Sequence, residues 1–84
     1  MMEVTAEISM YPLQKEYIPA IDAVIEKLNS FDNVRVQTFT TATILLGEYV
    51  TVMAALEQTI AWSYESYGSS VFAMKIIPGY IPDV

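Results

Sequence analysis

The chain has 84 residues and a formal net charge of −6 with only four cationic side chains, so it lacks the basic surface by which proteins bind nucleic acids and anionic membranes. It contains neither cysteine nor histidine, which excludes disulfides, thiolate and imidazole metal sites, and catalytic triads with an imidazole base. Hydrophobic residues make up 54% of the chain, more than one thin core of this size needs, and the surplus favours a buried interface between copies.

The N-terminal segment has no basic region followed by an apolar core, as a secretory signal would, and no apolar run approaches the roughly 20 residues of a membrane span. We therefore expect a cytoplasmic protein. Its length corresponds to a single domain over residues 1–84.

Residues 4–10 alternate between apolar and polar side chains, which predicts a strand that Pro12 should end. Its apolar face would consist of Val4, Ala6, Ile8 and Met10. A helix is predicted over residues 16–29, with Pro19 in its first turn, because apolar residues recur there at helical spacing. These residues are Tyr17, Ile21, Val24, Ile25 and Leu28.

Residues 34–47 are rich in β-branched side chains and contain no proline, and no glycine before position 47, which predicts two strands paired as a hairpin. Its turn should fall within residues 39–41. That segment lacks the Asn-Gly sequence of a tight two-residue turn, so the register of the hairpin is not predicted.

A second helix is predicted over residues 48–67, with Gly68 as its C-terminal cap. The stripe expected to face the core consists of Tyr49, Met53, Leu56, Ile60, Tyr64 and Tyr67. Trp62 lies roughly 200° around this helix from Ile60 and is expected to face away from the core. It is either a partly exposed or interface aromatic residue, or a ring that stacks on a ligand.

A last strand is predicted over residues 71–77, ended by Pro78 and Gly79, and residues 80–84 form a short tail without a predicted element. This strand is apolar on nearly both faces. We expect another subunit to cover the face that the helices of this chain leave open.

The predicted order is β-α-β-β-α-β, an α+β, ferredoxin-like fold with a four-stranded antiparallel sheet and two helices on one face. The other face of the sheet would carry Glu7, Ser9 and Lys75 and would meet solvent, a ligand or another sheet.

Glu7 is the one acid in the middle of a predicted strand, where it is either an ion-pair partner of Lys75 or a ligand carboxylate. The hydroxyls of residues 38–43 are either ordinary strand side chains or a polar strip that orients a small ligand. Without histidine or cysteine the chain has few side chains suited to catalysis, so we expect no catalytic residue, no metal and no cofactor.

Several segments follow one another along nearly the whole chain: residues 7–13 (Glu-Ile-Ser-Met-Tyr-Pro-Leu), Thr38 and Thr43 ahead of Gly47, Tyr49 with Val52 and Met53, and Phe72 with residues 75–79 (Lys-Ile-Ile-Pro-Gly). Together, in this order, they resemble the YkoF-related thiamine-binding protein family. The resemblance implies a non-enzymatic protein that binds thiamine or its hydroxymethylpyrimidine moiety without transforming it. It also implies a homodimer through the sheet face, or a tetramer of two such dimers.

In the binding site that this resemblance implies, Glu7 and the hydroxyls of Ser9, Thr38 and Thr43 would contact the pyrimidine. Trp62 or a tyrosine would contact the thiazolium cation.

Relatives often have Asn, Ser and Gln where this chain has Phe39, Ala42 and Ile44, so a less polar heterocycle is an alternative ligand. Two other functions stay open: an oligomerising regulatory domain without a small ligand, and a small enzyme on a dimeric α+β scaffold.

Overall fold

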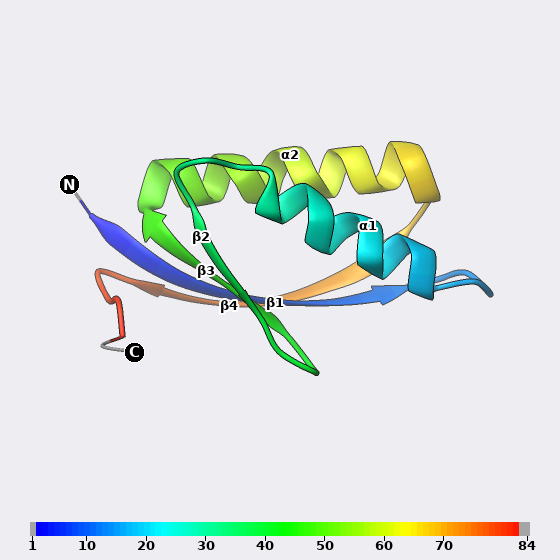
Figure 1. Ribbon diagram of the computed structural model, residues 1–84, viewed down its shortest axis with the longest axis horizontal. Coiled ribbons are helices and arrows are strands. Elements are labelled where there is room, and N and C mark those ends of the chain that lie inside the picture. The colour runs from blue at the N-terminus through cyan, green and yellow to red at the C-terminus, as the bar shows by residue number, and fades with distance from the viewer. Residues whose placement is uncertain (1, 83–84) are drawn as a thin grey trace.

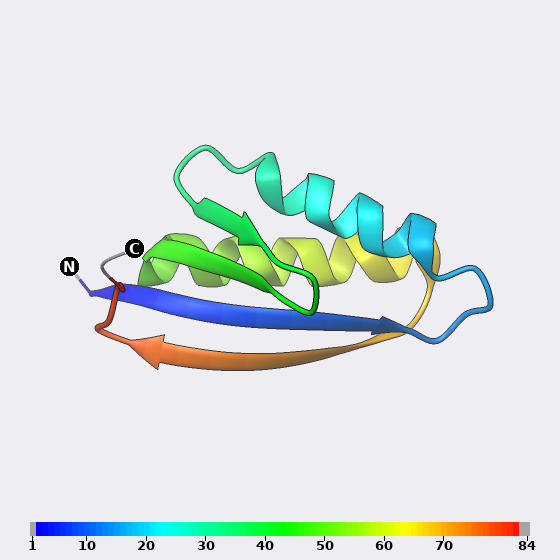
Figure 2. The ribbon, with the colours of Figure 1, turned by 60° about the horizontal axis from the view of Figure 1, so that its bottom comes forward.

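The computed structural model describes residues 2–82, which form a sheet of four antiparallel strands with both helices on one face (Figure 1). The elements are β1 (Glu3–Pro12), α1 (Ile18–Asn29), β2 (Arg35–Thr38), β3 (Thr43–Glu48), α2 (Tyr49–Tyr67) and β4 (Ser70–Pro78). The strand order is β2-β3-β1-β4, which Figure 2 shows with β4 at one edge. The predicted ferredoxin-like α+β fold is confirmed.

The ends of the elements follow from the residues that the sequence offers there. β1 ends at Pro12, and α1 begins at Ile18 rather than at the predicted residue 16, with Pro19 in its first turn. The hairpin loop spans residues 39–42, where the turn was expected. Gly68 follows α2 with a φ of +85°, a backbone conformation that residues with a Cβ rarely adopt. Its amide donates a hydrogen bond to the Tyr64 carbonyl.

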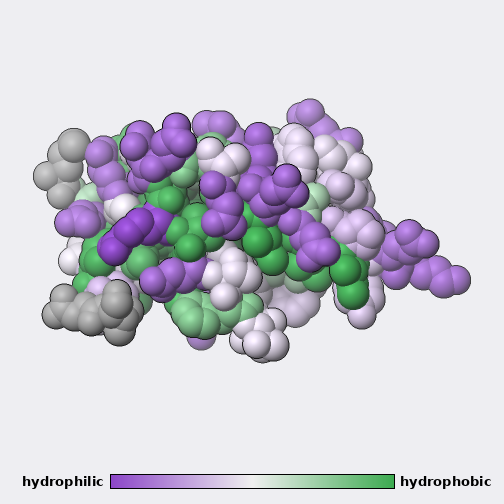
Figure 3. Space-filling model, viewed as in Figure 1, coloured by the Kyte–Doolittle hydropathy of each residue, from purple (hydrophilic) through white to green (hydrophobic). Residues whose placement is uncertain are grey.

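The core lies between the helices and one face of the sheet. The register places Ala6 of β1 opposite Leu45 of β3 on one side and Ile76 of β4 on the other, so these three side chains share the face beneath the helices. Ala6 and Leu45 are fully buried there. In Figure 3, hydrophobic residues form a band along one side of the molecule, between the helices and the sheet.

The prediction for the core-facing side of α2 is wrong in part. Leu56 is buried as expected, but Tyr64 is 65% exposed and Tyr49 is 37% exposed. The buried residues of α2 are Val52, Ala55, Leu56, Thr59 and Ser63. Because apolar residues surround α2 on most sides, their periodicity did not identify one face.

The opposite face of the sheet, called the open face below, carries Glu7 and Ser9 of β1. At one end of this face the hydroxyl of Thr5 donates a 2.6 Å hydrogen bond to the carbonyl of Tyr80, so the chain after β4 folds back over it. No helix among residues 2–82 is long and apolar enough to cross a membrane.

Candidate functional site

A hollow lies where the second half of β1, the hairpin loop and α1 meet. It has a volume of about 130 Å³ and is walled by apolar residues, among them Met10, Ile21 and Val24, while hydroxyls of the loop supply polar groups. A second, more open hollow of about 450 Å³ adjoins it and shares Met10, Ile21, Thr40 and Thr41 with the first. We call the two together the hairpin hollow.

One hydrogen bond joins the hairpin loop to β1, and a second closes the loop on itself. The hydroxyl of Ser9 donates to the carbonyl of Thr41 over 3.0 Å, and the amide of Phe39 donates to the carbonyl of Ala42 over 2.8 Å. Since the proton of Ser9 is used in this bond, its oxygen remains available only as an acceptor for a ligand.

The backbone of Met10 supplies a further donor and acceptor. The Tyr49 amide donates to the Met2 carbonyl, and the β1–β3 pairing runs on from there without a bulge. Even-numbered residues of β1 therefore direct their amide and carbonyl groups toward β3. Since β3 begins at Thr43, opposite Ile8, the two polar groups of Met10 point at the hairpin loop instead of a paired strand.

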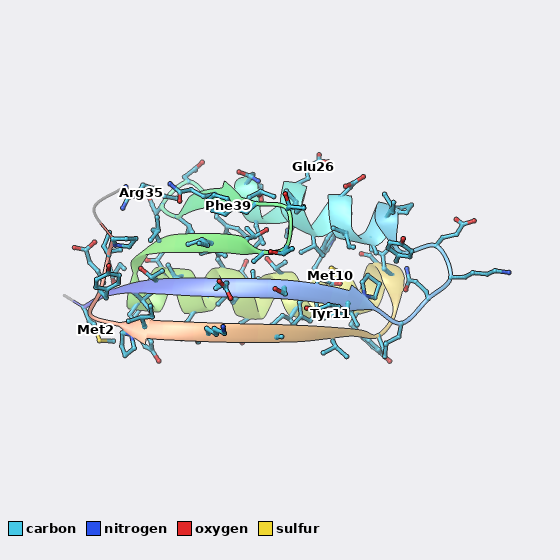
Figure 4. The ribbon with its side chains drawn as sticks, turned by 90° about the horizontal axis from the view of Figure 1, so that it is seen from below. Met2, Met10, Tyr11, Glu26, Arg35 and Phe39 are labelled. Carbon is cyan, nitrogen blue, oxygen red and sulfur yellow. The ribbon has the colours of Figure 1, made fainter. Side chains whose placement is uncertain are left out.

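Figure 4 shows Met10 and Tyr11 together near one end of β1, far from Met2 at the other. At Met10 the edge of β1 is therefore not paired with β3. The N–H and C=O of this one residue lie next to the hairpin loop, which carries hydroxyls. Such a pair is complementary to a planar ring that carries an amino group beside a ring nitrogen.

The five predicted site residues fall into different places. Ser9 and Thr43 both line the hairpin hollow. Thr38 lies opposite Thr43 in the β2–β3 register and is exposed, outside the residues that line the hollow. Thr43 is itself opposite Ile8, so it lies beneath the helices, whereas Glu7 lies on the open face. The sheet thus separates Glu7 from Thr43 within one subunit.

Trp62 lies in a third place, a groove of about 460 Å³ between α1 and α2. Its ring is half-buried and packs against the edge of the core, so the expectation that it faces away from the core is wrong. The Lys27 ammonium lies 5.5 Å from the centre of the indole ring, and Tyr67 meets that ring edge-on at 6.1 Å. The contact between Lys27 and Trp62 joins α1 to α2, whereas the contact between Trp62 and Tyr67 lies within α2.

Sequence reasoning considered Phe39 only as a departure from the relatives, and it missed Tyr17 and Ile21 as lining residues of the site. A signal was present in the sequence, because Ile21 and Ile25 extend the apolar stripe of α1 beyond what the sheet covers, and both stay half-exposed.

The described lining of the hairpin hollow contains no charged side chain. Among residues 2–82 there is also no group of three acidic side chains close enough to hold a metal ion.

Residues 3–74 match the family described as the YKOF-related Family. No curated protein matches the chain. Among solved structures, a Streptococcus pneumoniae protein is 23% identical with a TM-score of 0.84, covering 94% of this chain and 89% of that one. A candidate thiamine biosynthesis/salvage protein of Thermotoga maritima is 21% identical with a TM-score of 0.79, covering 88% and 81%. A domain of unknown function from Bacillus cereus is 20% identical with a TM-score of 0.76, covering 96% and 78%. At these identities the structural likeness shows the fold.

Proposed function

The chain belongs to the YKOF-related family, and from this membership we propose that it is a non-enzymatic protein that binds thiamine or its hydroxymethylpyrimidine moiety. The ligand lies in the hairpin hollow. The structurally similar protein of Thermotoga maritima, described as a candidate in thiamine biosynthesis or salvage, supports this ligand class.

The observation that carries the proposal is the mixture of groups at the hollow. Apolar walls from α1 and β1 suit the faces and methyl group of a small ring, and the hydroxyls of Ser9 and Thr43 lie at its edge. The free amide and carbonyl of Met10 match the acceptor nitrogen and the amino donor of an aminopyrimidine. The first hollow accommodates the pyrimidine, and the thiazolium extends into the more open part, beside Tyr11 and Tyr17.

The chemistry of this lining supports binding without turnover. Hydroxyls, backbone groups and apolar side chains orient a ring, while the lining provides no carboxylate that could act as a general acid or base. The net charge of −6 favours a cationic ligand over a phosphorylated one.

We further propose that the chain forms a homodimer through the open face, and a tetramer when two dimers associate. Val71 and Ile77 of β4 are each 49% exposed on that face, beside the pair of Glu7 and Lys75. Burial of apolar side chains against a second sheet offers the favourable free energy for such contact. The same surface is the observation behind a second candidate function, an assembly domain without a small ligand.

A thermal-shift titration with thiamine, hydroxymethylpyrimidine and thiamine phosphate tests the proposal. A ligand at about 100 times its dissociation constant should raise the free energy of unfolding by about 2.7 kcal/mol. Thr43→Val, which removes one hydroxyl from the hollow at nearly constant volume, should weaken binding at least several-fold, whereas Glu7→Gln on the open face should not. Loss of binding in Glu7→Gln alone would move the site to the open face. A flat response to all three compounds, with the oligomer intact, would favour the assembly domain.

A further inference from the structure

Phe39 is the phenylalanine whose ring the rest of residues 2–82 leaves largely uncovered. Of the three phenylalanines in the sequence, Phe31 and Phe72 pack against the core, whereas Phe39 is 57% exposed and lines the first part of the hairpin hollow. Figure 4 shows Phe39 at the hairpin loop, beside α1. Packing in the core of this chain therefore does not account for a large apolar ring at this position.

The fold of the hairpin loop does not require an aromatic ring either. The backbone closes the loop, because the Phe39 amide donates to the Ala42 carbonyl over 2.8 Å, and Thr38 and Thr43 pair across its two ends. The residues favoured in turns supply special backbone conformations or short side chains that hydrogen-bond to the backbone, and phenylalanine supplies neither. The role of this ring therefore lies in the hollow that it lines.

The first part of the hairpin hollow has the size of a single ring. Its volume is about 130 Å³, and a protein cavity of roughly 150 Å³ lined by apolar side chains takes up one benzene molecule. Phe39 lines this space from the loop, and Ile21 and Ile25 line it from α1. A planar ring in this space contacts apolar side chains of both elements, and a second ring has to stay in the more open part beside Tyr17.

The backbone that carries Phe39 is held in place before a ligand arrives. The Ser9 hydroxyl donates to the Thr41 carbonyl over 3.0 Å, and this bond joins the loop to β1. Only the two side-chain torsions of Phe39 remain to be ordered, so stacking on a ligand has a low cost in conformational entropy. An offset-stacked pair of aromatic rings is favourable beyond the apolar area that it buries.

We propose that Phe39 is the specificity-determining residue of the hairpin hollow: its ring stacks on the pyrimidine of the ligand and restricts the first part of the hollow to one flat aromatic ring. This role of Phe39 rests on the proposed function, since it is a contact within that binding site. The two rings of thiamine then have different aromatic partners. Phe39 lines only the first part of the hollow and contacts the pyrimidine, while Tyr17 lines only the more open part and contacts the thiazolium.

Calorimetric titration of Phe39→Ala with hydroxymethylpyrimidine and with thiamine tests this role. Both affinities should fall by the same factor, about 5- to 150-fold, because both compounds contain the pyrimidine on which Phe39 stacks. Phe39→Tyr keeps an aromatic ring and should bind both compounds nearly as the parent protein does. Tyr17→Ala should instead weaken the binding of thiamine more than that of hydroxymethylpyrimidine.

A matched control is Tyr64→Ala. It removes an aromatic ring that is 65% exposed on α2 and lines neither part of the hollow, so both affinities should stay at the parent values.

NMR of the bound ligand separates stacking from an indirect effect of the substitution on the loop. The ring current of Phe39 should shift the methyl protons of bound hydroxymethylpyrimidine upfield in the parent protein and in Phe39→Tyr. This shift should disappear in Phe39→Leu, which keeps an apolar side chain at the same position without an aromatic ring.

The outcomes distinguish the role of Phe39 from the binding function itself. Full affinity for both compounds in Phe39→Ala would overturn the role of Phe39 and leave the proposed function in place. A loss of affinity for thiamine alone would also overturn it, because Phe39 would then contact the thiazolium. A parent protein that binds neither compound would reject the proposed function, and the role of Phe39 with it.

Discussion

The hydroxyl of Ser9 donates a hydrogen bond of 3.0 Å to the carbonyl oxygen of Thr41, across 32 positions of the chain. This contact joins β1 to the hairpin loop just where the β1–β3 ladder has ended. It holds one wall of the hairpin hollow at a set distance from the strand edge, so the shape of the hollow depends on it.

Ser9→Ala should therefore reduce ligand affinity more than it reduces stability. The bond is exposed, so its loss should lower the free energy of unfolding by about 0.5–1.5 kcal/mol. The loss of binding free energy for the best ligand should be larger than this loss of unfolding free energy. The reason is that the loop loses its hydrogen bond to β1 and the ligand loses an acceptor. Calorimetric titration and urea unfolding measure the two effects. Ser66→Ala on the exposed side of α2 is the matched control, and equal affinity in both variants would exclude Ser9 from the site.

The amide of Met10 should report directly on the ligand. We expect its proton resonance to shift downfield on saturation with hydroxymethylpyrimidine, since it gains an acceptor where it faced the loop. The amide of Ile8 already belongs to the β1–β3 ladder and should shift much less. Binding that raises the melting temperature but leaves Met10 unperturbed would show that the ligand sits elsewhere, with the binding function intact.

Threonines at positions 59 and 5 should respond oppositely to replacement by valine. Thr59 is fully buried in α2 and its hydroxyl has no hydrogen-bond partner among residues 2–82, so Thr59→Val should raise the free energy of unfolding by about 1 kcal/mol or more. Thr5 donates to the Tyr80 carbonyl, so Thr5→Val should lower it by about 0.5–1.5 kcal/mol. Urea denaturation of the two variants provides the comparison. Destabilisation by Thr59→Val would mean that its hydroxyl is paired in solution.

Glu7 and Lys75 lie directly opposite each other on β1 and β4. Lys75→Glu creates two like charges at this pair and should lower the free energy of unfolding by about 0.2–1 kcal/mol. Adding Glu7→Lys reverses the order of the charges and should restore most of the loss. The recovery should shrink as salt is added, because exposed charges are screened. Additive effects in this double-mutant cycle would show that the two charges do not interact.

The fluorescence of Trp62 should not change when the ligand binds. Its ring contacts Lys27 and Tyr67 between the helices and does not line the hairpin hollow. Saturation with thiamine should therefore raise the melting temperature while the indole emission stays constant. An emission change with the same midpoint as the thermal shift, lost together with binding in Lys27→Ala, would place the ligand in the groove between α1 and α2.

Much of the fold was predictable because local patterns determine it. The alternation of residues 4–10, the position of Pro19 and the glycine at position 68 each limit the backbone conformation within a few residues. The side of α2 that faces the sheet was not predictable in the same way. Large apolar residues occupy several sides of that helix, and its buried side includes the small residues Ala55, Thr59 and Ser63, which the apolar periodicity does not indicate.

The succession of strands and helices along the chain was predictable from side-chain periodicity and turn chemistry, and the hydroxyl-rich composition of the hairpin is part of the sequence itself. That Ser9 and Thr43 line one hollow, while Glu7 and Thr43 lie on opposite faces of the sheet, became evident only from the three-dimensional structure. The reason is the register. A shift of one residue between β1 and β3 would transfer every side chain of β3 to the other face, and no short turn joins these two strands to set their register.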